Sequence, residues 1–194
     1  SPVHRPVPLD VISLPRLDAQ GHVVGERSLV GLFPLSVYAL SPRQIPFLQP
    51  KVEAVLARAG VPLDGHRGKQ LLHVLETYPR DELFQVEQGE LFELAIGMLD
   101  LQDRSRVALF TRRDPLGRFV SCLVYAPRDR YDSDLRRRFG RVLEESYGGS
   151  ISSFTTSTGD ALARVHYLVQ LGTEGAREVE DQTVEERLQQ TARS

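Results

Sequence analysis

Arginine is the residue type in this sequence whose placement most suggests chemistry. Its planar guanidinium presents a fork of donors that suits carboxylates and phosphates, and polar side chains at the ends of strands and helices are well placed to bind a ligand or a neighbouring domain. Six arginines lie in short polar segments of this kind, and they are our candidate effector-binding or interface residues: Arg80, Arg112, Arg113, Arg118, Arg128 and Arg130.

The same segments support a plainer interpretation. Each arginine cluster carries its own acidic residue, namely Asp81, Asp114 and Asp129. Arginine and aspartate that are close in sequence often form salt bridges that fix loops, and such pairs leave nothing for a ligand. Only two of the 24 basic residues are lysines, Lys51 and Lys69, which is typical of a genome that favours arginine codons. Ligand binding and an internal ion-pair network therefore both stay open.

Other kinds of site find little support in the sequence. It contains no Gly-x-Gly-x-x-Gly and no Gly-x-Ser-x-Gly, and the segment 65–69 (GHRGK) has Leu63 and Gln70 where a phosphate loop needs Gly and Ser or Thr. The five histidines are scattered, and no Cys/His set has zinc-site spacing. Cys122 lies within an apolar run, so we expect a buried, unreactive thiol. We predict no catalytic, cofactor-binding or metal site in this chain.

Composition limits the partners. Of the 194 residues, 41% are hydrophobic and 26% are charged, which is typical of a globular domain. The net charge of −2 gives no reason to expect nucleic acid as a partner, and no run of 18 apolar residues could span a membrane. Residues 1–10 lack the apolar stretch of a signal peptide, and a single cysteine cannot form a disulfide within the chain. We therefore expect a cytoplasmic protein.

Three helices are expected in the first half of the chain. Apolar residues recur at helical spacing over residues 47–59, 66–78 and 88–102. Gly60 and Pro79 end the first two of these helices. Upstream, residues 9–16 and 22–33 read as two strands joined by a turn, and residues 34–50 read as a loop that leads into the first helix.

The second half of the chain changes to a period of two. Strands are expected at 106–113 and 118–126, around the sequence Asp-Pro-Leu-Gly of a type I turn. A helix follows at 133–147, with Asp132 or Ser133 as its cap, and two more strands follow at 150–156 and 161–171. Beyond residue 172 the chain is acidic and polar, and residues 183–192 have the pattern of a helix whose packing partner is missing.

These elements contain the order β-α-β-β-α-β of a ferredoxin-like split βαβ unit, with a strand in 23–33 as its first strand. We therefore expect an α+β fold with a mainly antiparallel sheet, an extra N-terminal hairpin strand and a helical insertion at about 46–103. The module would comprise residues 1–171, with 172–194 as a linker or the start of the next helical segment. A division into two small units near residue 104 stays open.

Two long segments resemble a known family. LETYPRDELFQ (residues 75–85) and RRDPLGRFVSCLVYAPRDRY (residues 112–131) are similar to signatures of the large bacterial NAD-specific glutamate dehydrogenases. LDAQG (17–21) and VGLF (30–33) fit the same family, so the similarity extends from about residue 10 to residue 171, most of the chain. The resemblance implies a much longer parent chain that oxidatively deaminates L-glutamate to 2-oxoglutarate and ammonia with NAD. It places this segment in an N-terminal region of ACT-like modules and helical segments.

The resemblance carries over no catalytic residue, because neither lysine lies in a catalytic context. It implies a non-catalytic regulatory or oligomerisation module that contacts the rest of the parent chain and other subunits of a homo-oligomer, with an amino acid as a possible effector. NAD would be the cofactor of the parent, with none bound in this segment. The alternative is a purely structural interface without a ligand. RNA binding on the sheet is disfavoured, because Phe119 and Tyr125 lie in a run too apolar for an open face.

Overall fold

The computed structural model describes the chain except for residues 1–9, 103–105, 160, 174 and 194. The chain forms two compact units, Ser1–Ser41 and Pro42–Ser194. The alternative boundary near residue 104 and residues 1–9 of the N-terminal segment lie outside the described residues. Within the described part, no helix is long and apolar enough to cross a membrane.

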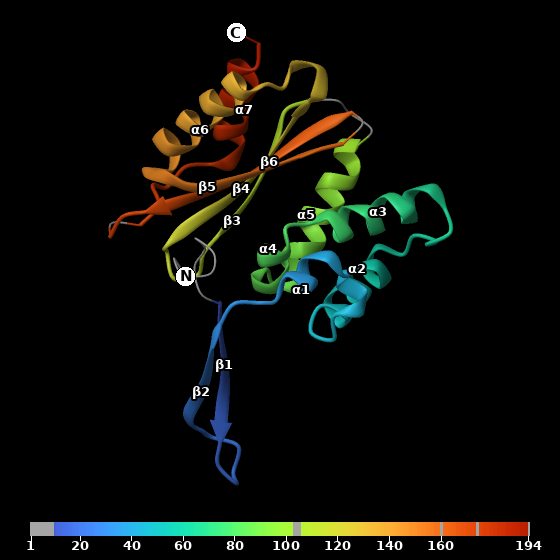
Figure 1. Ribbon diagram of the computed structural model, residues 1–194, viewed down its shortest axis with the longest axis vertical. Helices are drawn as coiled ribbons and strands as arrows, with labels where there is room; N and C mark the ends of the chain where they lie inside the picture. Colours follow the sequence, from blue (N-terminus) through green and yellow to red (C-terminus); the bar gives the residue numbers. More distant parts are fainter. Residues whose placement is uncertain (1–9, 103–105, 160, 174, 194) are drawn as a thin grey trace. The chain divides into compact units, whose positions relative to one another are not determined.

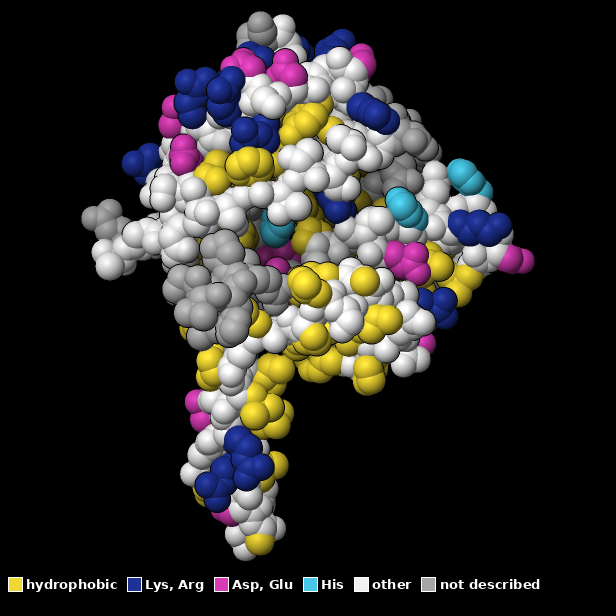
Figure 2. Space-filling model, viewed as in Figure 1, with side chains coloured by type: hydrophobic (Ala, Val, Ile, Leu, Met, Phe, Trp, Pro, Cys, Tyr) yellow, Lys and Arg dark blue, Asp and Glu magenta, His cyan; other side chains and the backbone are white. Residues whose placement is uncertain are grey.

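The first unit is a β-hairpin followed by a short helix. Strands β1 (Asp10–Leu17) and β2 (Val23–Gly31) pair antiparallel. The Asp18 side chain fixes the turn by accepting the backbone N–H groups of Gln20 and His22, each at 2.9 Å. The hairpin exposes most of its large aliphatic side chains, which Figure 2 shows as apolar patches along it. The predicted hairpin is confirmed, but part of the expected loop is helical, as α1 (Leu35–Ala39).

The second unit begins with a helical segment. After the 3₁₀ turn η1 (Pro42–Gln44) come α2 (Gln49–Ala59), α3 (His66–Thr77), α4 (Arg80–Gln85) and α5 (Gln88–Gln102). The three predicted helices are confirmed, and α4 is an addition in the segment that the sequence marked only as polar. Helix α5 packs against both α2 and α3. Fully buried leucines and valines form their shared core, including Leu48, Val52, Leu71, Leu75 and Leu91.

The rest of the second unit is a four-stranded antiparallel sheet with two helices. Its elements are β3 (Ala108–Arg113), β4 (Phe119–Pro127), η2 (Arg128–Arg130), α6 (Ser133–Tyr147), β5 (Gly149–Thr158), β6 (Leu162–Leu171) and α7 (Asp181–Thr191). The strand order is β3-β4-β6-β5. Asp132 caps α6 by accepting the N–H of Leu135 at 2.7 Å, as its sequence position predicts.

The α+β class, the mainly antiparallel sheet and the N-terminal hairpin are confirmed, but the connectivity differs from the expected βαββαβ order. Strand β2 pairs with β1 in a separate two-stranded sheet. The four-stranded sheet is built from the order ββαββ, and α7 follows it. Strand β2 hydrogen-bonds to β1, its neighbour in sequence, through a short turn. The βαββαβ order would instead need a long crossover from β2 to the four-stranded sheet.

Helices cover both faces of the four-stranded sheet (Figure 1). On one face α6 and α7 pack on a core that includes Cys122, Phe139, Tyr147 and Tyr167. On the other face α5 approaches β3 closely. A Cβ atom built on Gly97 of α5 would lie only 2.7 Å from the Phe110 ring of β3. The sheet therefore holds the helical segment and the α6–α7 pair on opposite sides.

Helix α7 has its packing partner within the chain, so the expectation that this partner is missing is wrong. Val184 and Leu188 are fully buried and belong to the core on the α6 side of the sheet. The helix contacts both α6 and β3. The mostly polar sequence of α7 gives little sign of this packing. Two apolar residues four positions apart are enough to form one narrow buried stripe on a helix.

Candidate functional site

Arg112 is buried in a network that joins the helical segment to the sheet. Its guanidinium on β3 donates two hydrogen bonds to the Glu82 carboxylate on α4, from Nε at 2.7 Å and from Nη2 at 3.0 Å, and a third to Gln85 Oε1 at 3.2 Å. The side chains of Arg112 and Glu82 are 3% and 2% exposed. Burial alone would lower the pKa of Arg112, but the bonds and charge of Glu82 raise it. The structure thus gives Arg112 an internal partner.

Two more candidate arginines fix local structure. Arg118 pairs with Asp114 across the β3–β4 turn through bonds of 2.7 and 2.9 Å, and this bonding lowers the pKa of Asp114. Arg113 lies 3.6 Å from the Asp181 carboxylate and donates to the Val179 carbonyl at 3.1 Å. These contacts tie down the turn and the segment that leads into α7. They match the ion-pair interpretation of the arginine clusters.

Arg128 and Arg80 lie on different elements, η2 and α4. Arg128 donates to the Gly159 carbonyl at 3.1 Å, which links η2 to the β5–β6 turn. Arg80 is the first residue of α4 and is only 9% exposed, and burial lowers its pKa against the raising effect of Glu76. The six candidates therefore do not form one cluster.

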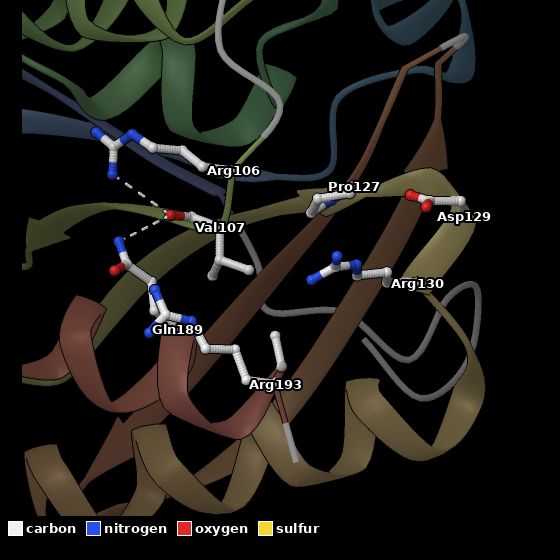
Figure 3. Close-up of a pocket in the computed structure, with 8 residues that line it drawn as sticks. Arg106, Val107, Pro127, Asp129, Arg130, Gln189 and Arg193 are labelled. Carbon is white, nitrogen blue, oxygen red and sulfur yellow. Dashed lines mark hydrogen bonds between the residues drawn. The ribbon is translucent and has the colours of Figure 1, made fainter.

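Arg130 lines a cavity. The cavity encloses about 400 Å³ beside the C-terminal end of α7, and Figure 3 shows its side chains converging from α7, from η2 and from the residues before β3. The lining residues are Arg106, Val107, Pro127, Asp129, Arg130, Gln189, Ala192 and Arg193.

Hydrogen bonds organise one wall of this pocket. Arg106 donates to the carbonyl of Val107 at 3.4 Å and to Glu185 on α7 at 2.5 Å. Gln189 Nε2 donates to the same Val107 carbonyl at 3.2 Å and to Glu185 at 3.0 Å. Because Glu185 neutralises Arg106, this wall contributes little net charge.

The remaining charge of the pocket comes from different elements, with Arg130 on η2 and Arg193 just after α7. Among the described residues, the side chains of Arg130 and Arg193 have neither a hydrogen bond nor an ion pair, and both are exposed at the pocket rim. Asp129 is the neighbouring carboxylate. Val107, Pro127 and Ala192 add apolar surface to the lining, here called the apolar floor. The pocket thus combines two guanidinium groups, one carboxylate and an apolar floor.

The sequence alone did not identify most of this pocket. The sequence does not mark Arg106 and Arg193 as a pair, because they are 87 positions apart. Gln189 carried no signal at all, since glutamine is common on exposed helix faces. Only the packing of α7 against β3 brings these residues beside Arg130.

The remaining reactive side chains are accounted for by packing. Cys122 is buried, as predicted, and burial raises the pKa of its thiol. His166 forms a 2.8 Å hydrogen bond with the Ser121 hydroxyl, and burial lowers the pKa of its imidazole. Over the described ranges, no three His, Cys, Asp or Glu side chains come together in a way that could hold a metal ion.

A second, more open cavity of about 940 Å³ follows α6 and β5. The guanidinium of Arg136 stacks over the ring of Phe154, 3.9 Å from its centroid. Charged residues of both signs line the α6 side, and serines line the β5 side: Asp134, Arg137, Arg141, Glu144, Ser152 and Ser153.

Comparison with known proteins divides the second unit in the same way as its structure. Residues 45–104 match the family described as glutamate dehydrogenase, helical motif 1. Residues 108–194 match glutamate dehydrogenase, ACT2 domain. The first range contains α2 to α5, and the second contains the four-stranded sheet with α6 and α7. The sheet unit is therefore the ACT-like part of the fold.

Relatives named NAD-specific glutamate dehydrogenase extend the match over the whole chain. The protein of Halomonas elongata is 43% identical over 99% of this chain, and that of Pseudomonas aeruginosa is 39% identical over 100% of it. The protein of Mycobacterium tuberculosis is 38% identical over 78% of the chain. The chain spans only 12% of the length of the first two and 9% of the third. Similarity to the helical motif, the ACT2 domain and these relatives shows that the chain belongs to the NAD-specific glutamate dehydrogenase family.

Proposed function

We propose that this chain is a non-catalytic regulatory and oligomerisation module of an NAD-dependent glutamate dehydrogenase. The parent enzyme would oxidatively deaminate L-glutamate to 2-oxoglutarate and ammonia in the cytoplasm, with NAD bound elsewhere in the longer chain. The match to a helical motif and an ACT2 domain, over about an eighth of the relatives' length, supports this assignment.

The two lysines support a non-catalytic role. The Lys51 ammonium donates to the carbonyls of Leu83, Phe84 and Val86, at 2.9, 3.3 and 2.8 Å, and so caps the end of α4. Lys69 is exposed on α3. An ammonium whose three donors are already bonded to backbone carbonyls is a structural clamp, and it has no free proton to offer a substrate.

The pocket beside α7 is our proposed effector site. A zwitterionic amino acid has a carboxylate that Arg130 and Arg193 could bind, an ammonium that Asp129 could accept, and a side chain that the apolar floor could cover. The single observation that carries this assignment is the pair of guanidinium groups without a partner among the described residues. We expect the bound amino acid to link η2 to α7, and thereby to bias the position of the segment that follows α7.

A purely structural interface is the second candidate function. It is favoured by the internal partners of Arg112, Arg113 and Arg118, which the ion-pair interpretation anticipated. On this alternative the module only holds subunits or domains together. Binding of an amino acid is then the property that separates the two functions.

The test is the rate of NAD reduction by the full-length parent enzyme, with and without each proteinogenic amino acid. We expect at least one amino acid to change the rate. The double variant Arg130→Ala/Arg193→Ala should raise the concentration needed for that effect by about tenfold or more, since each lost charged hydrogen bond is worth about 1.5–3 kcal/mol. The matched control is Arg58→Ala/Arg67→Ala, two exposed arginines on α2 and α3.

The outcomes separate the proposals. A response that the Arg130/Arg193 variant leaves unchanged would place the effector elsewhere. No response to any amino acid would leave the structural interface as the function. Turnover of glutamate by the 194-residue chain alone would contradict the non-catalytic assignment.

A further inference from the structure

Helix α7 bonds to the β3 edge of the sheet through side chains that are four residues apart. Three such contacts follow one another along the two elements, and we call them the α7–β3 ladder: Asp181 with the Thr111 hydroxyl, Glu185 with the N–H of Leu109 at 2.9 Å, and Gln189 Nε2 with the Val107 carbonyl at 3.2 Å. The partners on the strand side are two residues apart. The helix and the strand run in opposite directions along this contact.

The spacing of the ladder follows from the geometry of the two elements. Four helical residues advance by about 6.0 Å, and two strand residues by about 6.7 Å, so the two rows stay in step over three contacts. Strand β3 is at the edge of the sheet, and the N–H of Asp114 bonds to Phe119 of β4. Residues 107, 109 and 111 therefore turn their backbone groups away from β4. Side chains of α7 thus bond where a further strand would pair.

The row of side chains on α7 continues into the pocket of Figure 3. Arg193 is four residues after Gln189, and both line the pocket. The chain keeps a helical turn up to Arg193, whose N–H donates to the Gln190 carbonyl at 3.1 Å. Gln189 also donates to Glu185, the acceptor of the Leu109 N–H, at 3.0 Å. Gln189 is therefore shared by the ladder and the pocket.

The charges that line the pocket are unbalanced. Within the part of the chain that the structure describes, the side chains of Arg130 and Arg193 have neither a hydrogen bond nor an ion pair, and Asp129 is the carboxylate that lines the pocket with them. Arg106 is neutralised by Glu185. Two guanidinium groups thus share one carboxylate, and their repulsion opposes the closed position of the last turn of α7.

We propose that the charge in the pocket controls how firmly α7 is bonded to the β3 edge, and that Gln189 is the positioning residue that couples the two. Repulsion between Arg130 and Arg193 favours opening of the last turn and of the Gln189 contact. A carboxylate bound to both arginines favours the closed ladder, because both are within its reach only there. The inference rests on the pocket of the proposed function and names the structural change that its effector controls.

The first test needs no ligand. The N–H of Leu109 is the backbone donor of the ladder, so its hydrogen exchange in the full-length enzyme, followed by mass spectrometry with fragmentation to single residues, reports opening. Arg193→Gln or Arg130→Gln removes one of the two like charges. We expect either variant to slow the exchange of Leu109 by about twofold to fivefold, the effect of one exposed charge pair. The control Arg141→Gln removes the same charge from an exposed position on α6 and should have no effect.

The second test separates charge from packing. Raising NaCl from about 0.01 M to about 1 M shortens the screening length from about 30 Å to about 3 Å, so the difference between Arg193→Gln and the parent sequence should vanish. In a Gln189→Met background, which keeps the size of the side chain but not its hydrogen bonds, Arg193→Gln should no longer affect Leu109. Sodium acetate, which offers a carboxylate alone, should slow the exchange more than NaCl at the same ionic strength.

The outcomes are distinct from those of the amino-acid response. Equal exchange of Leu109 in the parent sequence and both arginine variants would overturn the proposal. An equal effect of Arg141→Gln, a difference that salt or Gln189→Met leaves unchanged, or the same exchange in acetate and chloride would also overturn it. The arginine variants are compared without any amino acid, so the ladder can respond to charge in an enzyme that no amino acid regulates, and regulation can persist if the ladder does not respond.

Discussion

Arg112 of β3 and Glu82 of α4 form a buried, doubly hydrogen-bonded ion pair at the contact between the helical motif and the ACT-like sheet. A buried ion pair gains little over an apolar pair, but removing one member leaves the other charge stranded. Gln85 adds a further acceptor for the same guanidinium. The pair therefore specifies how α4 packs on β3, and Arg112 has a structural role.

Removing one member of this pair should be costly. We expect Arg112→Met to lower the free energy of unfolding by about 3–5 kcal/mol, because Glu82 is then buried without its partner. The double variant Arg112→Met/Glu82→Met should cost much less than the two single variants added together. Urea unfolding followed by circular dichroism gives these values. Arg67→Ala, which breaks an exposed pair with Asp100, serves as a control and should cost at most about 1 kcal/mol. Equal costs at the two sites would refute the argument.

The Asp114–Arg118 pair predicts a specific pH dependence. The bonds from Arg118 hold the pKa of Asp114 below its usual value of 3.8, so the carboxylate releases its proton more readily in the folded protein than in the unfolded chain. This contribution to stability is fully present above pH 3.8 and is lost as the pH falls through the lowered pKa of the folded state. Asp114→Asn should flatten the dependence of the urea midpoint on pH in this acidic range.

Helix α7 should unfold together with the sheet. Leu188→Ala empties a fully buried position among α6, α7 and the sheet, and we expect a loss of about 2–5 kcal/mol. Gln190→Ala on the exposed side of the same helix should change the stability by less than about 0.5 kcal/mol. Hydrogen exchange would show α7 amides protected to the same degree as those of β4. Fast exchange in α7 with slow exchange in β4 would show that the helix is only loosely attached.

Gly97 lies at a close approach between α5 and the sheet. A Cβ atom at this position would lie 2.7 Å from the Phe110 ring, so Gly97→Ala should cost about 1–3 kcal/mol despite the better helix propensity of alanine. Gly89→Ala in the same helix meets no atom within 4 Å and should be neutral or stabilising by up to about 1 kcal/mol. Thermal unfolding of the two variants measures the difference directly. A stabilising effect of both substitutions would show that α5 does not press on β3.

Local sequence signals determined most of the elements. The 3.6-residue apolar period placed α2, α3 and α5 to within a few residues, and α5 at its observed bounds. The Asp-Pro-Leu-Gly turn placed the β3–β4 hairpin, where Gly117 has a φ of +66° and donates to the Asp114 carbonyl. Asp132 was one of two predicted caps for α6 and is the one that acts. These features depend on residues within a few positions of one another, so they can be predicted without knowledge of the fold.

Tertiary structure decided what the arginines do. Asp114 is four residues from Arg118, and their pairing could be foreseen, whereas Glu82 is thirty residues from Arg112 and meets it only because α4 docks on β3. The same holds for the pocket, which joins Arg130 to Arg193 through the packing of α7. It also holds for β2, which pairs with β1 instead of entering the main sheet. Periodicity and turn chemistry are local properties of a chain, but burial and long-range pairing depend on which surfaces meet when the elements pack.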